Sequence, residues 1–111
     1  ELKSQVDVVI CLDDYSFTKA GEVASVNNLH GALVYGIGHS TEAMYYVDMG
    51  LAECVVVPDE FQMGYQSLCE LSRKIQNSYY AMKNHQVSHS VIRRENLFSK
   101  ENQELLFTMS Q

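Results

Sequence analysis

The chain has 111 residues and a formal net charge of −6, with 46% hydrophobic and 20% charged residues. A chain of this length forms one small domain or part of a larger one, and its composition is typical of globular rather than disordered protein. The acidic balance argues against a nucleic-acid-binding surface, because such surfaces carry a basic face and the pair Arg93-Arg94 is too short to form one.

Three apolar runs, at residues 8–12, 33–37 and 54–57, dominate the first half of the chain. They are nearly continuous rather than alternating, which predicts strands buried on both faces, as in a parallel sheet covered by helices. Successive runs are separated by roughly 20–25 residues, enough for one right-handed strand–helix–strand crossover each. We therefore expect an α/β fold with three layers, helix–sheet–helix, around a parallel sheet.

Apolar residues at helical spacing follow each run. Ser16 or Asp14 is the expected N-cap of the first helix, and Ser40 that of the second, which Gly50 should close in a left-handed conformation. The third helix begins after Asp59 and is the most strongly amphipathic. We expect it to pack its apolar stripe on the sheet, with Gly64 allowing close approach. The stripe is Phe61, Gly64, Tyr65, Leu68, Leu71, Ile75 and Tyr79, and Glu70, Arg73, Lys74 and Asn77 lie outside it.

The last third of the chain is more polar. It predicts a loop, a short fourth strand around Val91-Ile92, and a final short helix capped by Ser99. We expect residues 1–80 to form one structural unit and residues 81–111 a C-terminal extension. Cys11, Cys54 and Cys69 lie in apolar or helical patterns, so we expect three buried thiols and no disulfide. No apolar run is long enough to span a membrane.

Ligands of open parallel sheets bind in the crevice beyond the carboxyl ends of the strands. The carboxylates there could accept hydrogen bonds from ligand hydroxyls, act in acid–base chemistry or bind a hard cation, or they could simply cap helices. The segment Gly36-Ile37-Gly38 lacks the third glycine of a dinucleotide-binding loop. We expect a ligand site without catalytic residue, metal or cofactor, formed by Asp13, Asp14, Tyr15, Gly38, His39 and Asp59.

The order of these features resembles a known family. An apolar strand ending in Asp13-Asp14 is followed by Val34-Tyr35-Gly36-Ile37-Gly38, Asp48-Met49-Gly50-Leu51-Ala52, a further apolar strand and Gln62-Met63-Gly64-Tyr65. This order and spacing are similar to those of the type 1 periplasmic sugar-binding proteins. The same fold serves the solute receptors of ABC importers and the effector domains of lactose-repressor-like regulators. The resemblance covers about residues 5 to 80.

The resemblance implies a two-lobed receptor that closes on a small sugar, with this chain as part of the C-terminal lobe. The N-terminal lobe and the beginning of this lobe would lie outside the chain. At the three polar contact positions of the family, Asp13 replaces Asn, Gly38 replaces Asp and Pro58 replaces Gln. His39, Tyr15 and Asp59 are the neighbours expected to substitute. The tail Ile92–Leu97 also resembles that of membrane-anchored receptors of Gram-positive bacteria.

The resemblance therefore implies a non-catalytic carbohydrate receptor of an ABC uptake or sensing system, extracytoplasmic and lipoprotein-anchored in its full length. Its partners would be a sugar, the missing lobe, and an ABC permease or sensor. The uncovered edge and apolar helix faces of a partial sheet also favour a homodimer. One alternative is the cytoplasmic effector-binding domain of a transcription regulator, and another is an enzyme on a flavodoxin-like sheet that uses Asp13 or Asp14.

Overall fold

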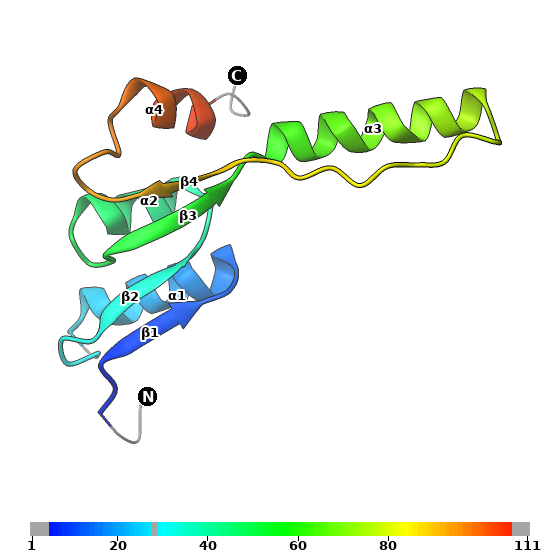
Figure 1. The fold of residues 1–111 in the computed structure, drawn as a ribbon. Coiled ribbons are helices and arrows are strands. Elements are labelled where there is room, and N and C mark those ends of the chain that lie inside the picture. Colours follow the sequence, from blue (N-terminus) through cyan, green and yellow to red (C-terminus); the bar gives the residue numbers. More distant parts are fainter. Residues whose placement is uncertain (1–4, 28, 108–111) are drawn as a thin grey trace.

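The structure is a computed structural model that describes residues 5–27 and 29–107 (Figure 1). Its sheet has four strands in the order β1 (Val8–Cys11), β2 (Leu33–Ile37), β3 (Cys54–Pro58) and β4 (His89–Ile92). The first three are parallel, and β4 is antiparallel to β3. The predicted α/β class with a mostly parallel sheet is confirmed. The carboxyl ends of β1, β2 and β3 lie along one edge, which we call the carboxyl edge.

Helices α1 (Asp14–Ser25) and α2 (Thr41–Asp48) connect the parallel strands, and α4 (Lys100–Phe107) lies beside α2. The Ser40 cap of α2 is confirmed, since its hydroxyl accepts from the amide of Ala43 at 3.1 Å. Gly50 follows α2 with φ 74°, as predicted. The predicted cap of α1 was wrong: Asp13 is the N-cap, and its Oδ1 accepts from the amide of Ser16 at 2.7 Å. Asp13 takes this role because its backbone is extended while Asp14 and Ser16 are already helical.

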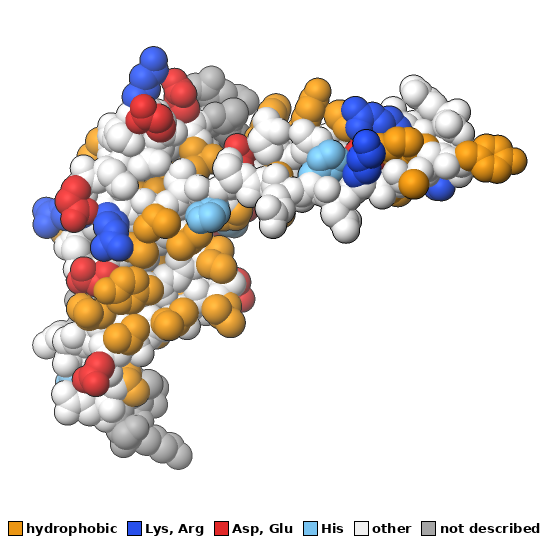
Figure 2. Space-filling view, in the orientation of Figure 1, with side chains coloured by type: hydrophobic (Ala, Val, Ile, Leu, Met, Phe, Trp, Pro, Cys, Tyr) orange, Lys and Arg blue, Asp and Glu red, His pale blue; other side chains and the backbone are white. Residues whose placement is uncertain are grey.

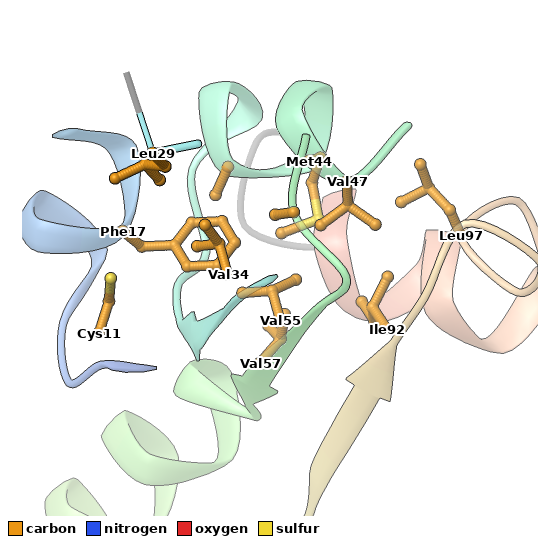
Figure 3. Packing of buried hydrophobic residues seen from close by; sticks show 12 residues of the cluster. Cys11, Phe17, Leu29, Val34, Met44, Val47, Val55, Val57, Ile92 and Leu97 are labelled. Carbon is orange, nitrogen blue, oxygen red and sulfur yellow. The ribbon is translucent and has the colours of Figure 1, made fainter. Parts of the chain in front are cut away.

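The hydrophobic core lies on the side of the sheet that α1 and α2 cover (Figure 3). Two close contacts in this region form only because one partner is a glycine. A Cβ at Gly36 would lie 2.5 Å from the ring of Phe17, and one at Gly21 would lie 2.2 Å from the ring of Tyr46. The helices can therefore approach the sheet and each other only because these positions lack a side chain. The largest fully buried side chains are Phe17, Val34, Val47, Val55 and Ile92.

The opposite face of the sheet is uncovered among the described residues. Ile10 is 70% exposed, and Figure 2 shows hydrophobic side chains gathered over this side of the strands. The expectation that the strands are buried on both faces was therefore wrong, and the second helical layer is missing from the described residues. Direct strand pairing and alternation place the exposed side chains together. We call this surface the bare sheet face, consisting of Val8, Ile10, Leu33, Ile37 and Val91.

The missing layer is explained by α3 (Glu60–Gln76), which points away from the sheet (Figure 1). Residues 77–88 return beside it to β4, and we call residues 60–88 the arm. The prediction that α3 packs on the sheet was wrong, since Leu68 and Ile75 are 69% and 84% exposed. A Cβ at Gly64 would meet no atom outside its own helix within 4 Å. Cys69, on the same helix, is half-buried rather than buried as predicted, whereas Cys11 and Cys54 are buried.

The polar face of α3, not its apolar stripe, packs within the arm. Glu70 is the one buried residue of α3, with 3% of its surface exposed. Its carboxylate accepts from the amide of Lys83 at 3.0 Å and the hydroxyl of Tyr80 at 2.9 Å, and contacts Nε2 of His85 at 2.8 Å. Arg73 donates to the same carboxylate at 3.0 Å. Glu70 thus binds α3 to the returning segment, although it lies outside the apolar stripe.

The last third of the chain contains the predicted strand and helix. β4 includes Val91 and Ile92 and completes the sheet, and the hydroxyl of Ser99 accepts from the amide of Asn102 at the start of α4. The proposed boundary near residue 80 falls within the arm, and the two-unit division stays a prediction. Residues 1–4 and 108–111 of those units lie outside the described residues. No described helix is long and apolar enough to cross a membrane.

We expect Gly36→Ala to destabilise the chain by about 1–3 kcal/mol, because its methyl group would overlap the Phe17 ring. Gly64→Ala is the matched control. It adds the same methyl group in open space within a helix and should stabilise the chain by roughly 0.5–1 kcal/mol. Urea unfolding followed by circular dichroism measures both changes, and equal effects of the two substitutions would contradict the packing described here.

We expect acid to open the arm at Glu70. The amide of Lys83, with His85 and Tyr80, lowers the pKa of Glu70 from 4.5 to about 2. A lowered pKa means that this stabilisation is present above pH 4.5 and is lost as the pH falls toward 2. Exchange of the Lys83 amide proton should therefore accelerate, relative to its intrinsic rate, over this range. Glu70→Gln should remove the acid dependence, and a wild-type amide equally protected at both ends of the range would refute it.

Candidate functional site

Asp14 joins the ends of two parallel strands at the carboxyl edge. It is the first residue of α1, separated from the end of β1 by Leu12 and Asp13, and its Oδ1 accepts from the amides of His39 at 2.8 Å and Ser40 at 3.0 Å. Partial burial raises the pKa of this carboxyl, but the two amide bonds outweigh burial and hold the pKa below its ordinary value of 3.8. Asp14 is therefore a fixed carboxylate that connects the start of α1 to the start of α2.

Gly38 provides the space for this connection. A Cβ at Gly38 would lie 3.0 Å from Oδ1 of Asp14 and 3.2 Å from a methyl group of Val55. A larger side chain there would compete with the Asp14 carboxylate for the same position. The absence of a side chain at Gly38, which replaces an aspartate of the resembled family, thus has a packing reason in this chain.

Asp13 and Tyr15 lie at the same end of the sheet but project from the start of α1. A hydrogen bond from the amide of Ser16 lowers the pKa of Asp13, so this side chain serves as a helix cap. Tyr15 is exposed, and the amino group of Lys19 lies 5.8 Å from the centre of its ring. Neither residue lines the cavity described next.

His39 and Asp59 flank the ends of β2 and β3. Nε2 of His39 lies 3.8 Å from Oε1 of Glu60, so the two can form an ion pair when the imidazole is protonated. Asp59 is the N-cap of α3, its Oδ1 accepting from the amide of Gln62 at 3.1 Å, as the sequence predicted. The contact between His39 and Glu60 brings polar groups from two consecutive strand ends together.

A cavity of about 280 Å³ opens at this edge. Its polar groups come from the start of α2 and from Glu60, and its apolar wall comes from β3, α3 and α4. Polar groups converging on an apolar wall are the usual composition of a small-molecule site. The lining residues are His39, Ser40, Thr41, Met44, Val57, Pro58, Glu60, Phe61, Leu105, Leu106 and Phe107.

Of the predicted site residues, the structure brings Asp14, Gly38 and His39 into direct contact and places His39 on the cavity wall. Asp59 stands between two wall residues, Pro58 and Glu60. The backbone amides of His39 and Ser40, at the start of α2, are occupied because they bond to Asp14. Whether these residues bind a ligand remains a prediction.

The sequence did not predict that Phe61 and α4 form part of the cavity wall. Phe61 was assigned to the core stripe of α3, and only the outward course of α3 leaves it at the edge. The sequence predicted a helix after Ser99, but no pattern indicated that α4 lies beside the end of β3 and the start of α2. Contacts between segments so distant in the chain have no local signal.

A larger hollow, about 510 Å³, lies in the arm between α3 and residues 82–87. Its carboxylate, Glu70, already contacts Arg73, Tyr80, Lys83 and His85. A carboxylate with these partners has little capacity left for a ligand. The carboxyl edge is therefore the better candidate site.

Comparison with known proteins gives one informative result. No protein-family profile and no curated protein match the chain. Among solved structures, it is similar to the carbohydrate transporter solute binding protein from Agrobacterium radiobacter, crystallised in complex with D-arabinose, with a TM-score of 0.76 and 16% identity. The chain has the fold of a partial periplasmic-binding-protein-like lobe. The match covers 89% of this chain and 34% of that protein, so the lobe spans about a third of its length.

We expect Asp14→Ala to destabilise the lobe by about 1–2 kcal/mol, because two backbone amides at the carboxyl edge lose their charged acceptor. Asp14→Asn keeps a carbonyl oxygen at the same place and should retain most of the stability. Because the pKa of Asp14 is lowered, its stabilising contribution is present above pH 3.8 and lost below it, so the Asn variant should lose less stability than wild type on acidification. Denaturant unfolding at pH 7 and pH 3 tests this, and indistinguishable Ala and wild-type curves would contradict it.

Proposed function

We propose that the chain forms part of one lobe of a non-catalytic carbohydrate receptor, and that the sugar binds at the carboxyl edge. The observation that carries this proposal is the cavity where the ends of β2 and β3 meet the start of α2. Parallel open sheets bind small ligands at this edge. The fold similarity to a sugar-binding protein supports the same ligand class.

The wall of the cavity suits a small sugar. A sugar presents hydroxyl groups around its rim and C–H groups on its faces. His39, Ser40 and Glu60 offer donors and acceptors for hydroxyls, while Phe61 offers an apolar face for C–H groups. The volume of about 280 Å³ is near the lower end of ligand pockets, which favours a monosaccharide.

Asp13, Asp59 and Tyr15 lie outside the cavity lining, and in this proposal they reach the ligand only where it extends beyond the cavity along the carboxyl edge. Asp13 and Asp59 each use Oδ1 to cap a helix, so Oδ2 is the oxygen that would accept from a ligand hydroxyl. Asp14 has a different part in this proposal. Its carboxylate holds the amides of His39 and Ser40 and therefore positions the His39 side chain.

The mechanism we propose is closure of two lobes on the ligand, with no covalent step. This lobe lines one side of the edge cavity and leaves the other side open. The chain spans about a third of the length of the similar receptor. A ligand that contacts both lobes stabilises the closed arrangement and shifts the population toward it. In the full-length protein we place this receptor outside the cytoplasm, lipoprotein-anchored, serving an ABC permease or sensor.

We expect the 111-residue chain to bind sugar weakly, with a dissociation constant above about 1 mM, because half of the clamp is absent. NMR titration with a large excess of D-arabinose, and with other pentoses and hexoses, should shift the backbone amides of residues 38–41 and 59–61. His39→Ala should weaken this response several-fold, while His30→Ala, at an exposed turn before β2, should not. Absence of shifts at the edge with every sugar would sink the proposal.

A further inference from the structure

We propose that the edge cavity selects an amino sugar, in which an ammonium group replaces one hydroxyl, over neutral and acidic sugars. Glu60 is the residue that determines this specificity. The inference rests on the proposed function, since it names the chemical class of sugar that binds in the same cavity. Three observations carry it: the contacts of Glu60, the occupied amides around the cavity, and the neighbouring aromatic ring.

Glu60 brings to the cavity a carboxylate without a fixed positive partner. Among the described residues, the ionisable side chains of the lining are Glu60 and His39, and no Lys or Arg lines the cavity. Nε2 of His39 lies 3.8 Å from Oε1 of Glu60, which is beyond hydrogen-bond distance, and the imidazole is charged only when protonated. The Glu60 side chain is 42% exposed, so a ligand in the cavity can reach its carboxylate. An ammonium group on the ligand would supply the missing positive charge.

The backbone amides that would attract an acidic sugar are occupied by the chain itself. Helix starts ordinarily bind anions, because their first amides lack partners within the helix. At the start of α2, however, the amides of His39 and Ser40 donate to Asp14. The amide of Ala43 donates to the hydroxyl of Ser40, and at the start of α3 the amide of Gln62 donates to the N-cap side chain. A ligand carboxylate would therefore meet the cavity carboxylate without these donors to compensate for the repulsion.

The aromatic ring of Phe61 favours the same class of ligand. Phe61 follows Glu60 at the start of α3, and both residues line the cavity. Its ring stacks on that of Tyr65, with ring centres 6.2 Å apart, and Phe61 remains 48% exposed. Aromatic rings pack on the C–H groups of a sugar, and their faces also attract an ammonium group. Consecutive residues of one helix thus offer an acidic and an aromatic contact to the ligand.

Carboxylates outside the cavity add to the negative charge of this edge. Asp13 and Asp14 lie at the start of α1, and hydrogen bonds from backbone amides lower the pKa of both. The chain as a whole has a formal net charge of −6. These charges raise the local concentration of a cationic ligand and lower that of an anionic one. They act at a distance, whereas Glu60 acts by contact.

The test is an NMR titration of the 111-residue chain at pH 7 with matched sugars. The pairs are D-glucosamine with D-glucose, D-galactosamine with D-galactose, and D-mannosamine with D-mannose. At least one amino sugar should shift the amides of residues 38–41 and 59–61 with a dissociation constant roughly threefold to fivefold below that of its neutral partner, as expected for a partly exposed ion pair. D-glucuronate should bind more weakly than D-glucose, and tighter binding of D-glucuronate than of every amino sugar overturns the inference.

Two variants show whether Glu60 is responsible. Glu60→Gln keeps the size of the side chain and removes its charge, so the ratio of the two dissociation constants should fall to about one. Glu53→Gln removes the same charge at an exposed position before β3, at the opposite end of the sheet, and should leave the ratio unchanged. Equal binding within every pair, or a preference that survives Glu60→Gln, overturns this inference while the proposed function stands. Absence of edge shifts with every sugar overturns both.

Discussion

A single residue between β3 and α3 determines which surfaces this chain exposes. Asp59 ends one element and caps the next, and its amide is bonded to Ser88 on the returning segment. The base of the arm is therefore held on both sides, and α3 continues outward. Because α3 leaves the sheet, one sheet face and the apolar stripe of α3 remain uncovered. The Phe61 end of the same helix becomes the wall of the edge cavity.

The polar groups at the carboxyl edge have two different roles. Some are hydrogen-bonded within the fold, and others face the cavity. The backbone amides of His39 and Ser40 donate to the carboxylate of Asp14. These two bonds fix the ends of β1 and β2 relative to each other. The imidazole of His39 and the carboxylate of Glu60 remain at the cavity, next to the amides that Asp14 holds. A lowered pKa keeps Asp14 ionised at neutral pH, which suits a fixed acceptor better than a general base. This division of roles accords with the proposed receptor function.

Much of the sheet and its helix caps could be predicted from the sequence, because both depend on neighbouring residues. The apolar runs gave β1, β2 and β3, and Ser40, Gly50 and Asp59 act as predicted at their helix ends. The course of α3 could not be predicted, since amphipathicity identifies an apolar face without identifying what covers it. The burial of Glu70 could not be predicted from the sequence for a similar reason. Its partners lie up to 15 residues further along, in a segment with no periodic pattern.

The sequence by itself determined the α/β class, the alternation of strands and helices, and the gathering of Asp13, Asp14, His39 and Asp59 near one end of the sheet. These features follow from local hydrophobic periodicity, capping and the geometry of parallel crossovers. Only the tertiary structure decided that Asp14 accepts a hydrogen bond from the amide of His39, and that Glu60, Phe61 and α4 form part of the cavity wall. It also decided that α3 projects away from the sheet. Those outcomes depend on contacts between distant segments, whose energies no local pattern of residues records.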